Sequence, residues 1–292
     1  MIEEKLRHAL GQLEVEFTRG PRDAERIARE GVRAGVERVI VAGGDGTLSE
    51  VVTGLLSADL GGYAKVGVLP LGTGGDFTRT LGASNEIDAA IEQLVEGRTR
   101  IIDAGRVTYR ASDGREADRY FANVASLGLS GLVGEWVNQR SKIVAGRGRF
   151  LIGALRGLIR YRRESVSIRV DGELVFDGPL VLAAVANGQY FGGGMRVAPD
   201  ALLDDGRLDW IVVPELSDNP LLSRLRLVYK LRPLYRGSHL FDPRIFHGRG
   251  RVIEARASTD RVRIEGDGEL LGTIPARIEL VPGAITLFGC RT

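Results

Sequence analysis

The sequence GGDGT at residues 43–47 places three glycines and an acid directly after an apolar segment and before a helical one. Glycine has no Cβ, so its backbone amide can turn sharply and approach a bulky partner. Amides at a helix N-terminus carry unsatisfied donors and partial positive charge, which suit the oxygens of a nucleotide phosphate. Thr47 and Ser49 add hydroxyl donors. The stretch therefore predicts a phosphate-binding loop.

The acidic residue of this loop, Asp45, fits beside phosphate only if a divalent cation or ordered water lies between them, which indicates a metal-nucleotide complex. A plain strand-to-helix turn is the simpler alternative, and the three glycines disfavour it. No Gly-Lys-Ser/Thr follows, so the loop is not a Walker loop, and its glycine spacing differs from a Rossmann fingerprint. GGDGT also occurs in NAD kinases, so the stretch alone does not name a substrate.

The segments around the loop predict an α/β domain. Apolar residues at helical spacing predict a helix over 21–35, and RVIVA at 38–42 is typical of a buried strand. A second unit follows, with a strand at 65–70, a glycine loop at 71–77 and a helix at 85–97. Alternating strands and helices imply a mostly parallel sheet, with ligands at the carboxyl ends of its strands. Both glycine loops are expected at that edge.

The pattern changes after about Asp103 to strand-like runs separated by turns, beginning with RYFANVA at 119–125. Strands that follow one another with few helices predict an antiparallel sandwich or barrel-like domain. The predicted nucleotide-binding domain comprises residues 1–103 and a C-terminal strand at about 277–292. The predicted β-rich domain comprises residues 104–276.

Composition limits the classes of protein. A chain of 292 residues with 43% hydrophobic content is long enough for two folded domains with substantial cores. Its formal charge of +2 is too small to indicate a nucleic-acid partner. A single cysteine, Cys290, excludes an intramolecular disulfide and fits a reducing cytoplasm. No segment has the roughly 20 apolar residues that span a bilayer, so a membrane would be met from its surface.

Two amphipathic segments, at 149–163 and 221–237, each combine an apolar face with an arginine face. A helix of this kind can lie on anionic headgroups, which would help an enzyme to extract an insoluble substrate. The alternative is a helix packed on its own domain with its arginines in water.

Further motifs follow the first loop along the chain. They are FTRGPRDA around Thr18, GGDGTLSE at 43–50, PLGTGGDFTR at 70–79, ANGQYFGGGMRVAPDALLDDGRLD at 186–209 and GDGELLG at 266–272. This ordered set resembles the diacylglycerol kinase catalytic-domain family, the bacterial lipid kinases related to sphingosine kinases. The resemblance runs from about residue 15 to residue 288. It implies an α/β nucleotide-binding domain of the NAD kinase and diacylglycerol kinase type, followed by a β-rich antiparallel sandwich.

The resemblance also implies an activity and its cofactors. ATP and Mg²⁺ would be used, and the γ-phosphate would pass to a lipid hydroxyl. Diacylglycerol, giving phosphatidic acid, is the first expected acceptor. The expected partners are this lipid alcohol and an anionic membrane surface, with no nucleic acid, and a homodimer is compatible with the sequence. The expected location is the cytoplasm, with peripheral attachment to a membrane.

The family pattern implies roles for individual residues. Glu269 would accept the proton of the lipid hydroxyl, and Asp76 would be the acidic partner near the transferred phosphate. The carbonyls of Leu202 and Arg207, with the Asp205 carboxylate, would bind a structural magnesium ion, a set of oxygens that suits this hard cation. The residues implied to contact ATP are Thr18, Gly43, Gly44, Asp45, Gly46, Thr47, Leu48, Ser49 and Thr73.

Two departures from the family pattern leave alternatives open. The family normally begins with a strand ending in Asn-Pro-x-Ser-Gly, and this sequence starts after it, while Gly75 stands where the family commonly has Asn. The alternatives are an NAD kinase-like small-molecule kinase and a non-catalytic nucleotide-binding or lipid-binding protein. Three acids near phosphate, Asp45, Asp76 and Glu269, argue against a pure binding role. Asp267-Gly268 by itself is equally typical of a hairpin turn.

Overall fold

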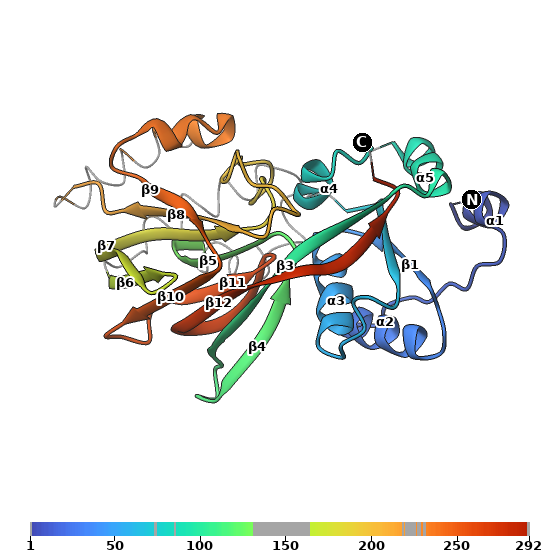
Figure 1. Ribbon diagram of the computed structural model, residues 1–292, viewed down its shortest axis with the longest axis horizontal. Coiled ribbons are helices and arrows are strands. Elements are labelled where there is room, and N and C mark those ends of the chain that lie inside the picture. The colour runs from blue at the N-terminus through green and yellow to red at the C-terminus, as the bar shows by residue number, and fades with distance from the viewer. Residues whose placement is uncertain are drawn as a thin grey trace.

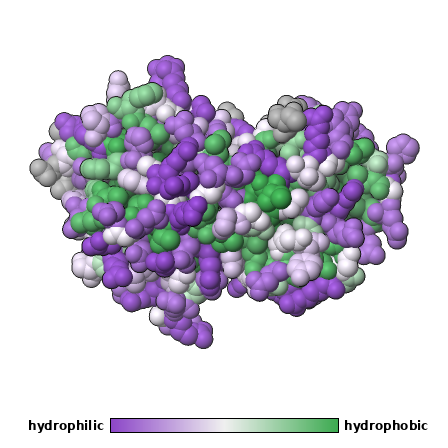
Figure 2. Space-filling model, viewed as in Figure 1, coloured by the Kyte–Doolittle hydropathy of each residue, from purple (hydrophilic) through white to green (hydrophobic). Residues whose placement is uncertain are grey.

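The computed structural model describes residues 2–72, 75–84, 86–130, 164–217, 219, 226, 229 and 232–290. They form a helix-containing body and a β-rich body, joined by long strands (Figure 1). In the space-filling view the two bodies are separate lobes with a waist between them (Figure 2). The segment expected at 149–163, most of the segment at 221–237, and Thr73 lie outside the described residues.

The first body contains the two strand-loop-helix units that the sequence predicts, and their positions are confirmed. Two helices were not predicted: one at the start of the chain, and a short one that begins at the end of the second glycine loop. The elements are α1 (Ile2–Leu10), α2 (Asp23–Arg33), β1 (Arg38–Gly43), α3 (Asp45–Leu56), β2 (Lys65–Pro70), α4 (Asp76–Thr80) and α5 (Ile87–Glu96).

The sheet of this body has a narrow parallel part. β1 pairs with β2 in parallel, and β2 pairs in parallel with the end of β12 (Glu269–Phe288). β3 (Thr99–Arg110) then runs antiparallel to β12, so the sheet is less uniformly parallel than predicted. Because β3 and β12 extend through both bodies, the division at residues 103 and 277 stays a prediction.

The second body is all antiparallel. Its strand pairings form a closed ring, β12–β10–β6–β7–β5–β11–β12, and a core that includes Phe121, Leu180 and Leu208 is buried among these strands. Its elements are β4 (Glu116–Phe121), β5 (Val124–Gly128), β6 (Glu164–Val170), β7 (Glu173–Ala186), β8 (Leu208–Pro214), η1 (Ser238–Phe241), β9 (Phe246–Gly250), β10 (Val252–Ala257) and β11 (Arg263–Gly266). No helix in the described part of the chain is both long and apolar enough to cross a bilayer.

The run at 119–125 forms two strands, where the sequence predicts one. The chain leaves the ladder at Ala122 and Asn123, between β4 and β5. There the carboxylate of Asp267 accepts the backbone amides of Ala122, Asn123 and Val124 at 2.9, 3.0 and 3.0 Å. A side chain distant in sequence thus takes the donors that a continuous strand would give to its neighbour, which fixes the turn after β11 against this junction.

A second buried carboxylate, that of Asp103 on β3, joins the two bodies. One oxygen accepts the amide of Gly206 at 2.8 Å, and the other accepts the amide of Gly283 at 2.7 Å. Only 4% of Asp103 is exposed. The turn that precedes β8 is therefore held to the strands β3 and β12.

We expect Asp103→Asn to destabilise the protein by about 1 to 3 kcal/mol, because an amide nitrogen would face one of two buried N–H donors and leave it unpaired. Asp118→Asn is the matched control, since Asp118 lies on the adjacent strand β4 in a solvent-exposed ion pair with Arg106. Urea unfolding of both variants measures the difference. Equal stability of the two variants would show that the contacts of Asp103 do not hold the turn.

Candidate active site

The two glycine loops lie at the carboxyl ends of β1 and β2, as predicted, and they also contact each other. The amides of Leu71 and Gly72 donate to the carbonyl of Gly43 at 3.1 and 3.2 Å. A Cβ on Gly72 would lie 2.5 Å from the Cα of Gly44. Only glycine permits two backbones to approach this closely.

Asp45, the acid of the first loop, holds the second loop in place. Its carboxylate accepts the amide of Asp76 at 2.8 Å and that of Phe77 at 3.4 Å, at the start of α4. Burial raises the pKa of Asp45, and the two amides act against that rise. The side chain predicted to face a metal-nucleotide complex is therefore also a helix cap, a role that the sequence pattern does not show.

Asp76 begins α4 and is 6% exposed. One carboxylate oxygen lies 2.7 Å from Nη1 of Arg79, and the other accepts the amide of Gly193 at 2.7 Å. Burial raises the pKa of Asp76, the Gly193 amide lowers it, and the neighbouring Asp45 raises it further. Asp76 thus joins the second glycine loop to the glycine-rich segment that follows β7.

The other predicted ATP contacts of the first loop have different environments. The hydroxyl of Thr47 lies against Gly43, where it would be 2.9 Å from an added Cβ. Leu48 is 2% exposed and packs in the core of the first body, and its amide donates to the carbonyl of Gly44 at 3.2 Å. Ser49 is also buried, and its Oγ has no hydrogen-bond partner among the described residues. Thr18 is exposed in the segment before α2.

Glu50, the last residue of GGDGTLSE, has a role that sequence reasoning missed. Its carboxylate accepts the amides of Arg22 and Ala24 at 2.9 and 3.1 Å, at the N-terminus of α2. Arg22 has a positive φ of 66° there and provides no side-chain cap. The sequence offers two weak signals of this capping role: Glu50 follows the glycine loop closely, and no capping residue type precedes α2.

The turn Gly266–Glu269 brings two more acids to the loops. Burial raises the pKa of Asp267 to about 6, although three backbone amides favour its ionised form. The side chain of Glu269 is 34% exposed, and its Oε2 lies 2.8 Å from Nη2 of Arg119. Burial raises the pKa of Glu269, and Arg119 opposes the rise.

These acids are close enough to affect one another. Asp45 raises the pKa of both Asp76 and Asp267, and Asp267 raises the pKa of Glu269. No group of three His, Cys, Asp or Glu side chains in the described residues could hold a metal ion by itself. Mg²⁺ is usually bound by one or two carboxylates together with substrate phosphates and water. Asp45 and Asp76, the acids of the two glycine loops, fit magnesium that arrives with a nucleotide.

The predicted structural magnesium ligands lie at the turn before β8. One oxygen of Asp205 accepts the amide of Arg207 at 3.0 Å, and the other lies 3.2 Å from Nη1 of Arg249. Leu202 is exposed, and the Gly206 amide between these residues is bound by Asp103.

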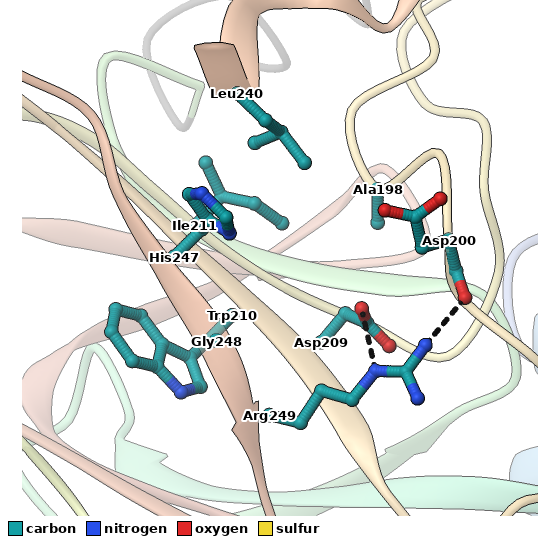
Figure 3. Close-up of a pocket in the computed structure, with 9 residues that line it drawn as sticks. All are labelled: Ala198, Asp200, Asp209, Trp210, Ile211, Leu240, His247, Gly248 and Arg249. Carbon is teal, nitrogen blue, oxygen red and sulfur yellow. Dashed lines mark hydrogen bonds and ion pairs between the residues drawn. The ribbon is translucent and has the colours of Figure 1, made fainter. Parts of the chain in front are cut away.

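A pocket of about 350 Å³ adjoins this turn (Figure 3). Arg249 crosses its polar side, where it contacts the carboxylate of Asp209 at 3.4 Å and the carbonyl of Asp200 at 2.7 Å. Ile211 and Leu240 line its apolar side. A guanidinium thus already supplies positive charge to Asp205 and Asp209, and a magnesium ion would compete with it. The ligand set Leu202, Asp205 and Arg207 stays a prediction.

The fold and this site together define a class of protein. A short parallel sheet carries two glycine loops, an antiparallel β body follows, and the acids of both meet beside the loops. Residues 1–107 match the family model "Diacylglycerol kinase catalytic domain", and residues 123–289 match "YegS C-terminal NAD kinase beta sandwich-like domain".

Individual relatives agree. A diacylglycerol kinase from Mycobacterium tuberculosis is 30% identical over 270 residues, which cover 92% of this chain and 82% of the relative. A diacylglycerol kinase from Staphylococcus aureus is 30% identical over 87% of this chain and 75% of the relative. A solved structure of a candidate diacylglycerol kinase from Bacillus anthracis superposes with a TM-score of 0.75 at 26% identity, covering 97% of this chain and 88% of that one. The chain belongs to the diacylglycerol kinase family. It is a kinase, a phosphotransferase that uses a nucleotide.

The structure gives a physical reason for one departure from the family. Gly75 has φ 66° and ψ 31°, the left-handed region, directly before α4. Glycine and, to a lesser degree, asparagine adopt this conformation readily. Both residue types therefore suit the position.

We expect Gly75→Asn to be tolerated and Gly75→Val to destabilise the protein by about 1 to 2 kcal/mol and to weaken nucleotide binding. Gly82 is the matched control, since it has the same φ of 66° and a Cβ added there would have no atom within 4 Å. Gly82→Val should carry the same stability cost without the loss of nucleotide affinity. Urea unfolding and calorimetric titration with nucleotide measure the two effects. Equal nucleotide affinity in the two valine variants would contradict the assignment of this loop to the nucleotide.

Proposed function

We propose that this chain transfers the γ-phosphate of Mg-ATP to the hydroxyl of a lipid, with diacylglycerol as acceptor and phosphatidic acid as product. The observation that carries the proposal is a series of neighbouring acids beside two touching glycine loops: Asp45 interacts with Asp76 and Asp267, and Asp267 interacts with Glu269. Among these acids Glu269 has the most exposed side chain, at 34%, so it is the one a substrate hydroxyl would reach. The names of the relatives support the choice of lipid.

The proposed nucleotide site consists of the residues that the family resemblance names. Backbone amides from Gly43 to Thr47 would bind phosphate oxygens, since amides at the start of α3 carry partial positive charge and have no partner inside the helix. Leu48 and Ser49 stay in the proposed set as residues that hold the loop in place, because their side chains are buried and the Leu48 amide donates to the carbonyl of Gly44. Thr18 and Thr73 complete the proposed set of residues that contact ATP. The alternative to a lipid as the acceptor of the phosphate is NAD or a similar small molecule.

Bound magnesium would neutralise charge on the phosphoryl group during transfer. Glu269 would orient the acceptor hydroxyl and take its proton late, because the transition state of phosphoryl transfer is loose and needs no strong base. Asp45 would keep the second loop in position through α4, and Asp76 would lie next to the transferred group. Leu202, Asp205 and Arg207 remain the proposed ligands of a structural magnesium ion.

The test is phosphate transfer by the purified protein with labelled ATP, magnesium and a panel of lipid alcohols in mixed micelles, together with NAD. We expect label in phosphatidic acid. Label in NAD alone would favour the small-molecule alternative, and nucleotide binding without transfer would favour a binding protein.

We expect Glu269→Gln to lower kcat by about 10² to 10⁴ while nucleotide affinity stays unchanged, because the amide cannot accept the proton. Since burial raises the pKa of Glu269, wild-type kcat/KM should fall on the acid side as that carboxylate is protonated. Glu254→Gln is the control, since Glu254 forms an exposed ion pair with Arg277 on the β-rich body. Full turnover by Glu269→Gln would remove Glu269 from the mechanism.

We further propose that the segment around η1 contacts an anionic membrane surface. Phe241 is 88% exposed, Tyr235 is 37% exposed, and the arginines Arg232 and Arg236 in the preceding turns are also exposed. Exposed aromatic side chains beside arginines are the combination that inserts at a headgroup boundary and attracts anionic lipid.

We expect Phe241→Ala to weaken sedimentation with phosphatidylserine-containing vesicles by roughly tenfold, through lost burial of one aromatic side chain. High salt should weaken binding further by screening the arginines. Tyr63→Ala is the matched control, an aromatic side chain 73% exposed on the other body. Absence of wild-type binding to these vesicles, or equal losses in the two variants, would contradict the proposed surface.

A further inference from the structure

A buried arginine joins the two bodies beside the candidate base. Arg119 lies on β4 and is only 6% exposed. Its Nη1 is 2.6 Å from Oε1 of Glu25, and its Nη2 is 2.8 Å from Oε2 of Glu269. Glu25 lies on α2 and is itself 6% exposed. One guanidinium therefore bridges a carboxylate of the first body and the carboxylate that begins β12.

The contacts continue from Glu25 to the first glycine loop. Glu25 also pairs with Arg22 at 3.1 Å, at the N-terminus of α2. Glu50, which ends the GGDGTLSE sequence, accepts the amides of Arg22 and Ala24 in that same turn. A continuous set of contacts thus leads from the glycine loop through α2 and Arg119 to Glu269.

Stability alone does not explain a buried arginine between two carboxylates. Removing charges from water costs several kcal/mol per ion, and well-packed apolar residues often serve a fold equally well. The Nε and Nη2 atoms of Arg119 are buried and make no aligned hydrogen bond in the described part of the chain. Glu25 thus anchors the guanidinium, and the contact of Nη2 with Glu269 is an ion pair without hydrogen-bond alignment. Because these nitrogen atoms are shielded from solvent, Arg119 acts on a substrate only through Glu269.

We propose that Arg119, anchored by Glu25, is a positioning residue that holds the Glu269 carboxylate ionised and oriented toward the acceptor hydroxyl. The proposal rests on the phosphoryl transfer proposed above. It assigns to α2 a part in catalysis, because α2 carries the anchor and is itself capped from the glycine loop.

The charges around Glu269 determine how the loss of Arg119 would act. Burial raises the pKa of Glu269, and Arg119 lowers it. The charged and titratable groups that interact with Glu269 are Arg119, Glu50, Glu25, Asp267, Arg22 and Tyr109. Without Arg119 the nearby acids are less opposed, so the pKa of Glu269 rises. A base with a higher pKa is protonated at higher pH, and the acid limb of kcat/KM moves upward.

The first experiment compares Arg119→Met and Arg119→Lys with wild type. We expect Arg119→Met to lower kcat by about 10² through misplacement of Glu269, with KM for ATP unchanged. Its acid limb should move up by about one pH unit. Arg119→Lys restores the charge and should recover part of both effects. Arg106→Lys is the control. Arg106 lies on β3 and forms a solvent-exposed ion pair, at 3.4 Å, with Asp118, which lies on β4 beside Arg119. An unchanged pH profile in Arg119→Met would overturn the proposal.

A double variant separates positioning from other roles. If Arg119 acts only through Glu269, Glu269→Gln/Arg119→Lys has the same kcat as Glu269→Gln alone. If the two losses multiply, Arg119 contributes to transfer by another route and the proposal fails.

A measurement without lipid keeps this inference separate from the proposed function. In ¹³C NMR with glutamate labelled at the side-chain carboxyl, Glu269 is assigned from the signal lost in Glu269→Gln, and its pKa is read by titration. We expect a higher pKa in Arg119→Met than in wild type, and an unchanged value would overturn the inference. Absence of phosphate transfer by wild type would instead refute the proposed function. If Arg119→Met does not fold, Glu25→Gln/Arg119→Met removes the stranded buried charge and is titrated in its place.

Discussion

Carboxylates that accept backbone amides hold this molecule together around its glycine loops. Asp45 binds two amides of α4, Asp267 binds three at the junction of β4 and β5, and Asp103 binds Gly206 and Gly283. In each case the partner lies far along the chain. An unpaired buried amide costs about 1 to 3 kcal/mol, so loops without regular hydrogen bonding take their positions from these acids.

The same arrangement creates an electrostatic conflict. Asp45, Asp76, Asp267 and Glu269 are partly desolvated and close enough that neighbouring acids raise one another's pKa. Backbone amides offset part of this repulsion. Arg79 and Arg119 offset a further part by pairing with Asp76 and Glu269. The positive charge of a magnesium ion bound together with the nucleotide would offset a further part. The carboxylates that hold the loops in place thereby also favour binding of the magnesium ion that we propose for this site.

Sequence patterns predicted the features that depend on local chemistry. The strand-loop-helix units follow from apolar periodicity, and the place of both glycine loops at one edge follows from parallel strands that end there. The caps made by Asp45 and Glu50 could not be predicted, because a carboxylate accepts any amide that the fold brings near it. RYFANVA has the composition of one strand, and only the distant Asp267 divides it. Arg119 is one of 40 basic residues, and its burial between two acids is a property of the fold.

The strands β3 and β12 determine how the two bodies are related. β12 begins at Glu269 in the ring of the β-rich body and ends by pairing with β2 of the first body, and β3 accompanies it from Thr273 to Phe288. The ladder shifts register between Thr273 and Arg277 and again between Val281 and Ile285, which are the places where paired strands bend. A rotation of one body against the other would have to deform this ladder and separate Glu25 from Arg119. The distance between Glu269 and the glycine loops is therefore fixed by continuous strands and one buried ion pair.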